Sequence, residues 1–127
     1  RKAVGLAAVV AINLASGAVA IAGPWEDGMV AYNRGDYMPA IKLLRPLAQA
    51  GNAKAQNIVG VMYHKGEGVA RSSAKAFMWF SLAAKRGDKQ AKANMQDMTK
   101  QMTPAEMNQA TQMTVACEAS LYRDCEY

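Results

Sequence analysis

The sequence predicts an all-α protein: a short α-solenoid of helix-turn-helix units that ends in a C-terminal capping helix. Three observations predict this fold class. After residue 24 the chain has no β-branched alternation long enough for a strand. Apolar residues instead recur at helical spacing in several segments, which begin at capping residues or end at glycine. The chain also matches itself at a fixed shift, as expected of a repeat architecture.

Six helices are expected, at residues 25–33, 37–50, 53–64, 72–86, 89–100 and 103–120. Glycines follow the first four, namely Gly35, Gly51, Gly66 and Gly87. In the second helix, Pro39 falls in the tolerated first turn, whereas Pro46 predicts a kink or local break. The sixth helix opens with Thr103-Pro104-Ala105-Glu106, a capping box with proline at the first helical position.

A shift of 36 residues aligns small residues with one another and helix-ending glycines with one another. The aligned pairs are Ala40 with Ala76, Ala48 with Ala84, Gly51 with Gly87, Ala55 with Ala91, and Met62 with Met98. Small residues are needed where two helices approach closely, and glycine is favoured where a helix ends. The pattern therefore indicates about two and a half stacked units, none of which can bury its apolar face alone.

Residues 53–87 read AKAQNIVGVMYHKGEGVARSSAKAFMWFSLAAKRG and resemble a Sel1-like repeat, a relative of the tetratricopeptide repeat. The residues that carry the resemblance are Ala55, Gly60, Met62, Tyr63, Gly66, Gly68, Ala76, Trp79, Phe80, Ala83, Ala84 and Gly87. Residues 23–52 resemble a degenerate leading unit with a shorter, tetratricopeptide-like loop. Residues 88–127 keep only the helical pattern and are interpreted as a partial repeat with a capping helix.

Structural roles are expected for these repeat residues. Gly60 lets its helix touch the partner helix near Ala76, and Gly66 and Gly68 give the loop conformations that other residues avoid. Four aromatic side chains are expected to fill the wedge between repeats: Tyr63, Phe77, Trp79 and Phe80.

Residues 1–22 have the pattern of a secretory signal peptide. Arg1 and Lys2 precede a charge-free apolar run, and Ala18-Val19-Ala20 is a small-x-small cleavage signal, so cleavage is expected after Ala20 or Ala22. The alternative is an uncleaved membrane anchor, because about 20 apolar residues can span a bilayer. Export predicts a periplasmic or secreted protein with no stable membrane insertion after cleavage.

Cys117 and Cys125 are the only cysteines. In a continuous helix their Cα atoms would lie about 12 Å apart, too far for a disulfide, so a bridge requires the tail to fold back. In cysteine-rich Sel1-like proteins a pair with this spacing is bridged, and the resemblance implies the same here. Free thiols are the alternative.

Composition and motifs argue against several function classes. The net charge of +5 is too small and too scattered for nucleic-acid binding. The single histidine, His64, has no second histidine or cysteine cluster with which to build a metal site or a catalytic triad. Met95, Met98 and Met102 share a helical face, which favours core packing over Cu(I) binding. The sequence therefore predicts no enzyme, no metal and no cofactor.

Ser72 and Lys75 form a Ser-x-x-Lys, the nucleophile motif of penicillin-interacting enzymes. The accompanying Lys-Thr-Gly and Ser-Asp-Asn tripeptides do not occur in the sequence. Ser72 also falls where a helix begins, so we expect it to cap that helix.

The leading functional hypothesis is a non-enzymatic module of the bacterial cell envelope that binds a protein or peptide on a concave face. Lys54, Asn57, Val61 and His64 form one stripe opposite Gly60. The neighbouring units are expected to add Asn33, Arg34, Gln90, Asp97 and Lys100. The alternatives are a Sel1-like protein that binds or hydrolyses β-lactams or cell-wall fragments, and a membrane-anchored structural partner in an envelope complex.

Overall fold

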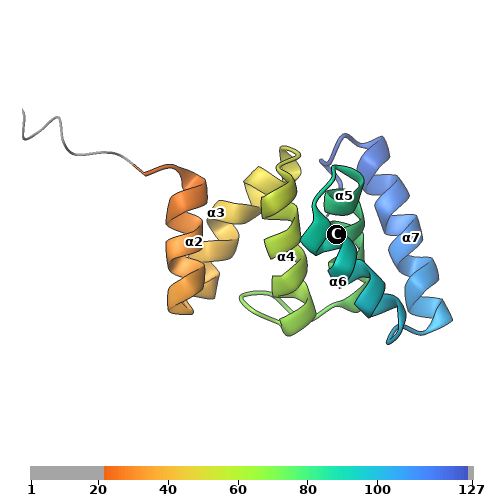
Figure 1. The fold of residues 1–127 in the computed structure, drawn as a ribbon. Helices are drawn as coiled ribbons and strands as arrows, with labels where there is room; N and C mark the ends of the chain where they lie inside the picture. The colour runs from red at the N-terminus through yellow and green to blue at the C-terminus, as the bar shows by residue number, and fades with distance from the viewer. Residues whose placement is uncertain (1–21, 126–127) are drawn as a thin grey trace, which may run out of the picture.

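The computed structural model describes residues 22–125, and within this range the chain is helical without strands. The helices are α2 (Pro24–Arg34), α3 (Tyr37–Gln49), α4 (Ala53–Lys65), α5 (Ser73–Lys85), α6 (Lys89–Thr99) and α7 (Pro104–Ala119). They follow one another across the molecule from α2 at one end to α7 at the other (Figure 1). The predicted all-α solenoid is confirmed. The expected signal peptide covers residues 1–22, and all of it except Ala22 lies outside the described residues.

Helix ends follow the capping chemistry of the sequence. The side chains of Asn52, Ser72, Asp88 and Thr103 each accept a hydrogen bond from a backbone N–H of the first turn. The expected break at Pro46 is wrong, because α3 continues through it to Gln49. Burial of the residues on either side explains why: Leu44 and Ala48 are fully buried, so packing holds the helix where proline removes a hydrogen bond.

The first two helix pairs are closed by a glycine in the first helix of each pair. A Cβ on Gly60 would lie 2.7 Å from the ring of Phe80 in α5, and one on Gly28 would lie 2.7 Å from Leu44 in α3. Because real Cβ atoms do not approach so closely, only glycine permits these crossings. The predicted close approach at Gly60 is confirmed, and Gly28 is its counterpart in the leading unit.

The core lies mainly between α4 and α5. Trp79, Phe80, Met62 and Met78 are fully or almost fully buried, and Tyr63 is 3% exposed. The expected burial is confirmed for Tyr63, Trp79 and Phe80, although Phe80 lies against Gly60 of the same helix pair. It is wrong for Phe77, which is only half-buried and lines a cavity near α7.

The loop between α4 and α5 packs on the leading unit. Gly68 has φ = 75°, and a Cβ there would lie 2.7 Å from the carbonyl oxygen of Tyr37. Its neighbour Glu67 accepts a hydrogen bond of 3.0 Å from the Tyr32 hydroxyl. Both contacts tie the repeat to the unit before it.

The third pair, α6 and α7, is built differently. Each helix packs against α5, but the two have almost no backbone proximity to each other. The 36-residue shift places Gln96, which is exposed, where α4 has Gly60, so this pair lacks the glycine that allows a close crossing. α7 instead packs through the buried stripe Ala110, Thr114 and Cys117.

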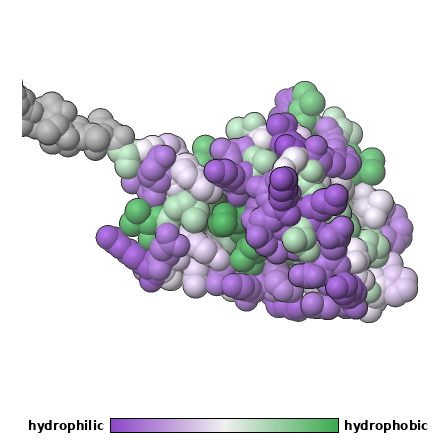
Figure 2. Space-filling model, in the orientation of Figure 1, coloured by the Kyte–Doolittle hydropathy of each residue, from purple (hydrophilic) through white to green (hydrophobic). Residues whose placement is uncertain are grey.

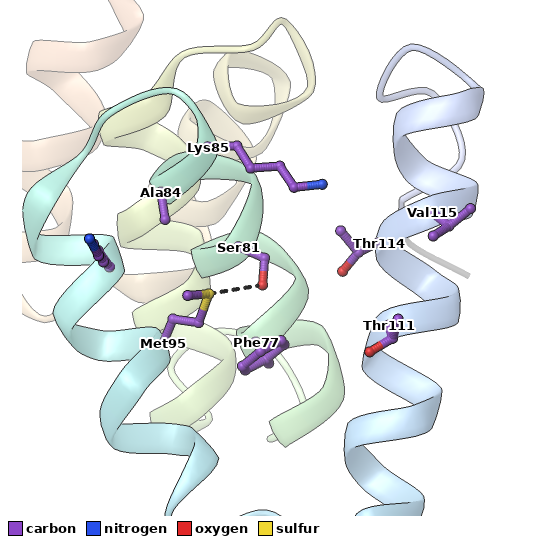
Figure 3. A pocket seen from close by; sticks show the side chains of 9 residues that line it. Phe77, Ser81, Ala84, Lys85, Met95, Thr111, Thr114 and Val115 are labelled. Atoms are coloured by element: carbon purple, nitrogen blue, oxygen red, sulfur yellow. Dashed lines mark hydrogen bonds between the residues drawn. The ribbon is translucent and has the colours of Figure 1, made fainter.

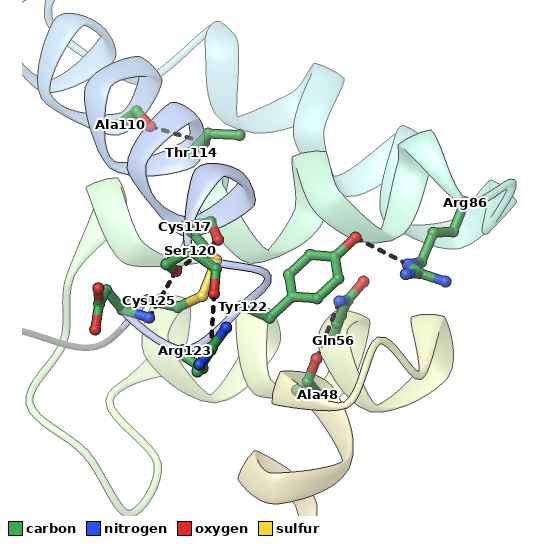
Figure 4. Close-up of a disulfide and its surroundings, with 11 residues drawn as sticks. Ala48, Gln56, Arg86, Ala110, Thr114, Cys117, Ser120, Tyr122, Arg123 and Cys125 are labelled. Atoms are coloured by element: carbon green, nitrogen blue, oxygen red, sulfur yellow. Dashed lines mark hydrogen bonds between the residues drawn. A yellow bond between two sulfur atoms is a disulfide. The ribbon is translucent and has the colours of Figure 1, made fainter.

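The tail after α7 folds back and is held by a disulfide between Cys117 and Cys125, whose Cα atoms lie 4.5 Å apart (Figure 4). The predicted pairing is confirmed. Leu121, with φ = 58° at this turn, is 70% exposed.

Tyr122 is the tail residue that packs inward. Arg86 Nε donates a 3.2 Å hydrogen bond to its hydroxyl, and the Arg86 guanidinium carbon lies 5.1 Å from the centroid of its ring. The same guanidinium covers Gly51, where a Cβ would lie 2.7 Å from it. Arg86 therefore contacts both the turn after α3 and the tail after α7.

Candidate binding groove

A groove of about 430 Å³ lies between α2, α4 and α6. Its lining is contributed by Tyr32 of α2, by Asn57, Ile58, Val61, His64 and Lys65 of α4, by Phe80 of α5, and by Gln90, Asn94, Asp97, Met98 and Gln101 of α6 and its end. Figure 2 shows the face seen in Figure 1, where hydrophilic side chains cover most of the surface and hydrophobic atoms appear in small separate groups.

Three carboxamides form a row across this groove. Gln90 Nε2 donates to Asn94 Oδ1 at 3.3 Å, and Asn94 Nδ2 donates to Asn57 Oδ1 at 3.0 Å. The second bond joins α6 to α4. Among the described residues, Asn57 Nδ2 and Gln90 Oε1 make no hydrogen bond. The row therefore ends in one donor and one acceptor.

Ionisable side chains also line the groove. His64 Nδ1 is buried and has no hydrogen-bond partner in the described part of the chain, while its backbone carbonyl accepts a bond from Arg71 Nε at 3.0 Å. Lys65 and Asp97 contribute one charge of each sign to the lining. Within residues 22–125, no cluster of three or more His, Cys, Asp or Glu side chains has an arrangement that would hold a metal ion.

Tyr32 closes the groove on the side of the leading unit. Burial raises the pKa of Tyr32 to about 12, and the hydrogen bond to Glu67 and the charge of that carboxylate act in the same direction. The phenol therefore stays protonated and keeps its hydrogen bond throughout the neutral and mildly alkaline range.

The structure brings together part of the expected concave face. Asn57, Val61, His64, Gln90 and Asp97 all line the groove. The other four expected residues, Asn33, Arg34, Lys54 and Lys100, are exposed and lie outside it.

The register of the leading unit explains why Asn33 and Arg34 are misplaced. Its loop is shorter, so Gly28 and Gly60 are equivalent at a shift of 32 residues rather than 36. At this shift Tyr32 takes the position of His64. An alignment of the two glycines with a gap would have identified Tyr32 as a groove residue. No such signal marks Asn94, because its partner Asn57 lies on a helix of another unit.

Ser72 is a helix cap, as expected. Its hydroxyl accepts a hydrogen bond of 3.1 Å from the backbone N–H of Lys75, which accounts for the Ser-x-x-Lys spacing. The methionine stripe also packs as expected: Met98 is buried in the core, and Met95 and Met102 pack against it.

Residues 53–88 match the Sel1 repeat family. No curated protein matches the chain. The matched segment contains α4, the loop after it and α5, and this is the pair that Gly60 closes. Sel1 repeats generally mediate protein–protein interactions, and the chain carries one such repeat in a helical array. Within residues 22–125, no helix is both long and apolar enough to cross a membrane.

Proposed function

We propose that this protein is a non-enzymatic binding module that holds an extended peptide segment of a protein partner in the groove between α2, α4 and α6. The observation that carries the proposal is the carboxamide row of Gln90, Asn94 and Asn57, which crosses this groove. The general role of Sel1 repeats in protein–protein interaction supports the same class of function.

Carboxamides suit the backbone of an extended peptide. A peptide group offers one N–H and one C=O, and an Asn or Gln side chain offers the complementary acceptor and donors. The unused Asn57 Nδ2 and Gln90 Oε1 would take one backbone carbonyl and one backbone N–H of the ligand. Ile58 and Val61, both half-buried in the lining, would contact the apolar side chains of the same segment.

We also propose that the protein acts in the periplasm or after secretion. The disulfide between Cys117 and Cys125 supports this location, because disulfides persist in oxidising compartments and are rare in the cytosol. An exported binding module of this size would serve as an adaptor in the cell envelope. No residue pair of the groove supports a catalytic role, and Ser72 is already used as a cap.

The experiment that tests the groove is selection of binders from a library of random linear peptides, followed by affinity measurements on variants. Asn57→Ala and Asn94→Ala should each weaken the selected peptides by about tenfold, the equivalent of one or two lost hydrogen bonds. Val61→Arg should abolish binding because it fills the groove. Lys54→Ala, on the same helix but outside the groove, is the matched control.

Circular dichroism and melting of each variant separate a lost contact from a lost fold. Selected peptides that bind the Asn57, Asn94 and Val61 variants as tightly as the original protein would overturn the proposal. A chromogenic β-lactam tests the enzymatic alternative in the same preparation. Turnover that disappears in Ser72→Ala would contradict the non-enzymatic assignment.

A further inference from the structure

A second cavity, of about 420 Å³, lies between α5, α6 and α7, away from the peptide groove (Figure 3). It exists because α6 and α7 both pack on α5 without packing closely on each other. Its walls are formed by Phe77, Ser81, Ala84 and Lys85 of α5, by Lys92 and Met95 of α6, and by Thr111, Thr114 and Val115 of α7.

The interior of this cavity has almost nothing to offer a polar ligand. Ser81 Oγ donates to the sulfur of Met95 at 3.4 Å, and Thr114 Oγ1 donates to the carbonyl of Ala110 at 2.8 Å. Thr111 Oγ1 likewise donates to the carbonyl of Met107, at 2.9 Å. Phe77, Ala84 and Val115 add apolar surface to the walls. A peptide backbone would lose its hydrogen bonds to water here without replacement, so an alkyl chain fits better.

Positive charge is confined to one end of the cavity. Lys85 is the last residue of α5 and Lys92 lies in the first half of α6, so the turn between these antiparallel helices places both at the same end. Lys85 Nζ is already paired with Glu118 at 2.8 Å. Lys92 makes no ion pair or side-chain hydrogen bond among the described residues. One positive charge is thus left without a counter-charge.

We propose that this cavity binds an alkyl carboxylate, a single-chain amphiphile with one negative charge. The alkyl chain would lie between α6 and α7 against Phe77 and Met95, and the carboxylate would pair with Lys92 at the charged end. A monoanion matches the single uncompensated positive charge better than a doubly charged phosphate does. The volume falls in the usual range of small-molecule sites, about 300–1,000 Å³.

The test is a calorimetric titration of the full chain with decanoate below its micellar concentration, with 1-decanol as the uncharged analogue. Decanoate should bind and should raise the melting temperature, by an amount that grows with the logarithm of its concentration above the dissociation constant. Lys92→Glu should weaken decanoate by at least about tenfold, as expected when a charge-assisted contact is lost. Ala84→Leu should weaken both ligands, because the added side chain occupies the cavity.

Two controls keep this site apart from the peptide groove. Lys89→Glu changes the same charge on an exposed position of α6 outside the cavity, and should leave decanoate binding within about twofold. Asn57→Ala should have no effect on decanoate. Absence of decanoate binding overturns the proposal. Equal affinities for decanol and decanoate, both in the original protein and in Lys92→Glu, overturn it as well.

Discussion

The pairs α4–α5 and α6–α7 have the same connectivity and opposite packing. In α4–α5, Gly60 brings the helices together and Phe80 fills the contact, so that almost nothing is left open. In α6–α7, Gln96 stands at the glycine position, and a cavity remains over Phe77. The pair with glycine at this position is closely packed, and the pair with glutamine there leaves a cavity.

Two phenylalanines on α5 offer the largest expected contrast. Phe80→Ala should lower the free energy of unfolding by about 3–5 kcal/mol, because the ring is 1% exposed in the closed pair. Phe77→Ala should lower it by only about 1–2 kcal/mol, because that ring is half-buried beside a cavity. Denaturant unfolding measures both. Should Phe80→Ala fail to fold, Phe80→Leu and Phe77→Leu give the same comparison, and equal losses would refute it.

The disulfide should be the main support of the open pair. Reduction of the bond between Cys117 and Cys125 opens a ring of nine residues and should lower the free energy of unfolding by about 2–3 kcal/mol. Denaturant unfolding with and without reductant measures the loss, and intact mass after alkylation reports the thiols. Identical unfolding curves would contradict this role.

The crossing residues themselves can be compared directly. Gly60→Ala places a Cβ against the Phe80 ring and should cost about 1–2 kcal/mol, after allowing for the better helix propensity of alanine. Gln96→Ala, the matched change in α6, should alter stability by no more than about 0.5 kcal/mol. If Gln96→Ala lowered the free energy of unfolding as much as Gly60→Ala, the proposed difference between the two helix crossings would be wrong.

The smallest expected effect is a pH dependence at the join between the leading unit and the repeat. The pKa of Tyr32 is raised in the folded protein, from the usual 10.0 to about 12. Its stabilising contribution is therefore fully present below about pH 10 and is lost as the pH rises through 12. Because Tyr32 is only partly buried, solvent screening should keep the loss below about 1 kcal/mol. The stability of Tyr32→Phe should depend less on pH between 10 and 12 than that of the original protein, and parallel stability curves for the two proteins would exclude the linkage.

Much of this architecture follows from local chemistry that is visible in the sequence. The caps at Ser72 and Thr103 and the crossing at Gly60 depend on neighbours along the chain or on one glycine, and such signals predict well. Pro46 was misjudged because the burial of its neighbours outweighs a lost backbone bond.

The groove was less predictable, because its lining residues come from four helices. Asn57 and Asn94 are 37 residues apart and meet only once both helices have packed, so no periodicity marks them as a pair. Asn33 and Arg34 were misplaced by a register shift in the leading unit that only the Gly28 contact reveals. The cavity beside Phe77 exists because α6 and α7 do not pack on each other. Sequence spacing predicts contacts that form, so it cannot predict a contact that is absent.

Arg86 has a consequence for how the whole chain unfolds. In a linear array each unit contacts only its neighbours, so one end can melt while the other persists. Arg86 covers Gly51 in the turn after α3 and stacks on Tyr122 in the tail after α7. If either end of the array unfolds, Arg86 loses one of these two contacts, and the contact with the other end becomes exposed to solvent. We expect the three units to share one cooperative transition, as small two-state domains do, in place of the stepwise fraying of longer solenoids.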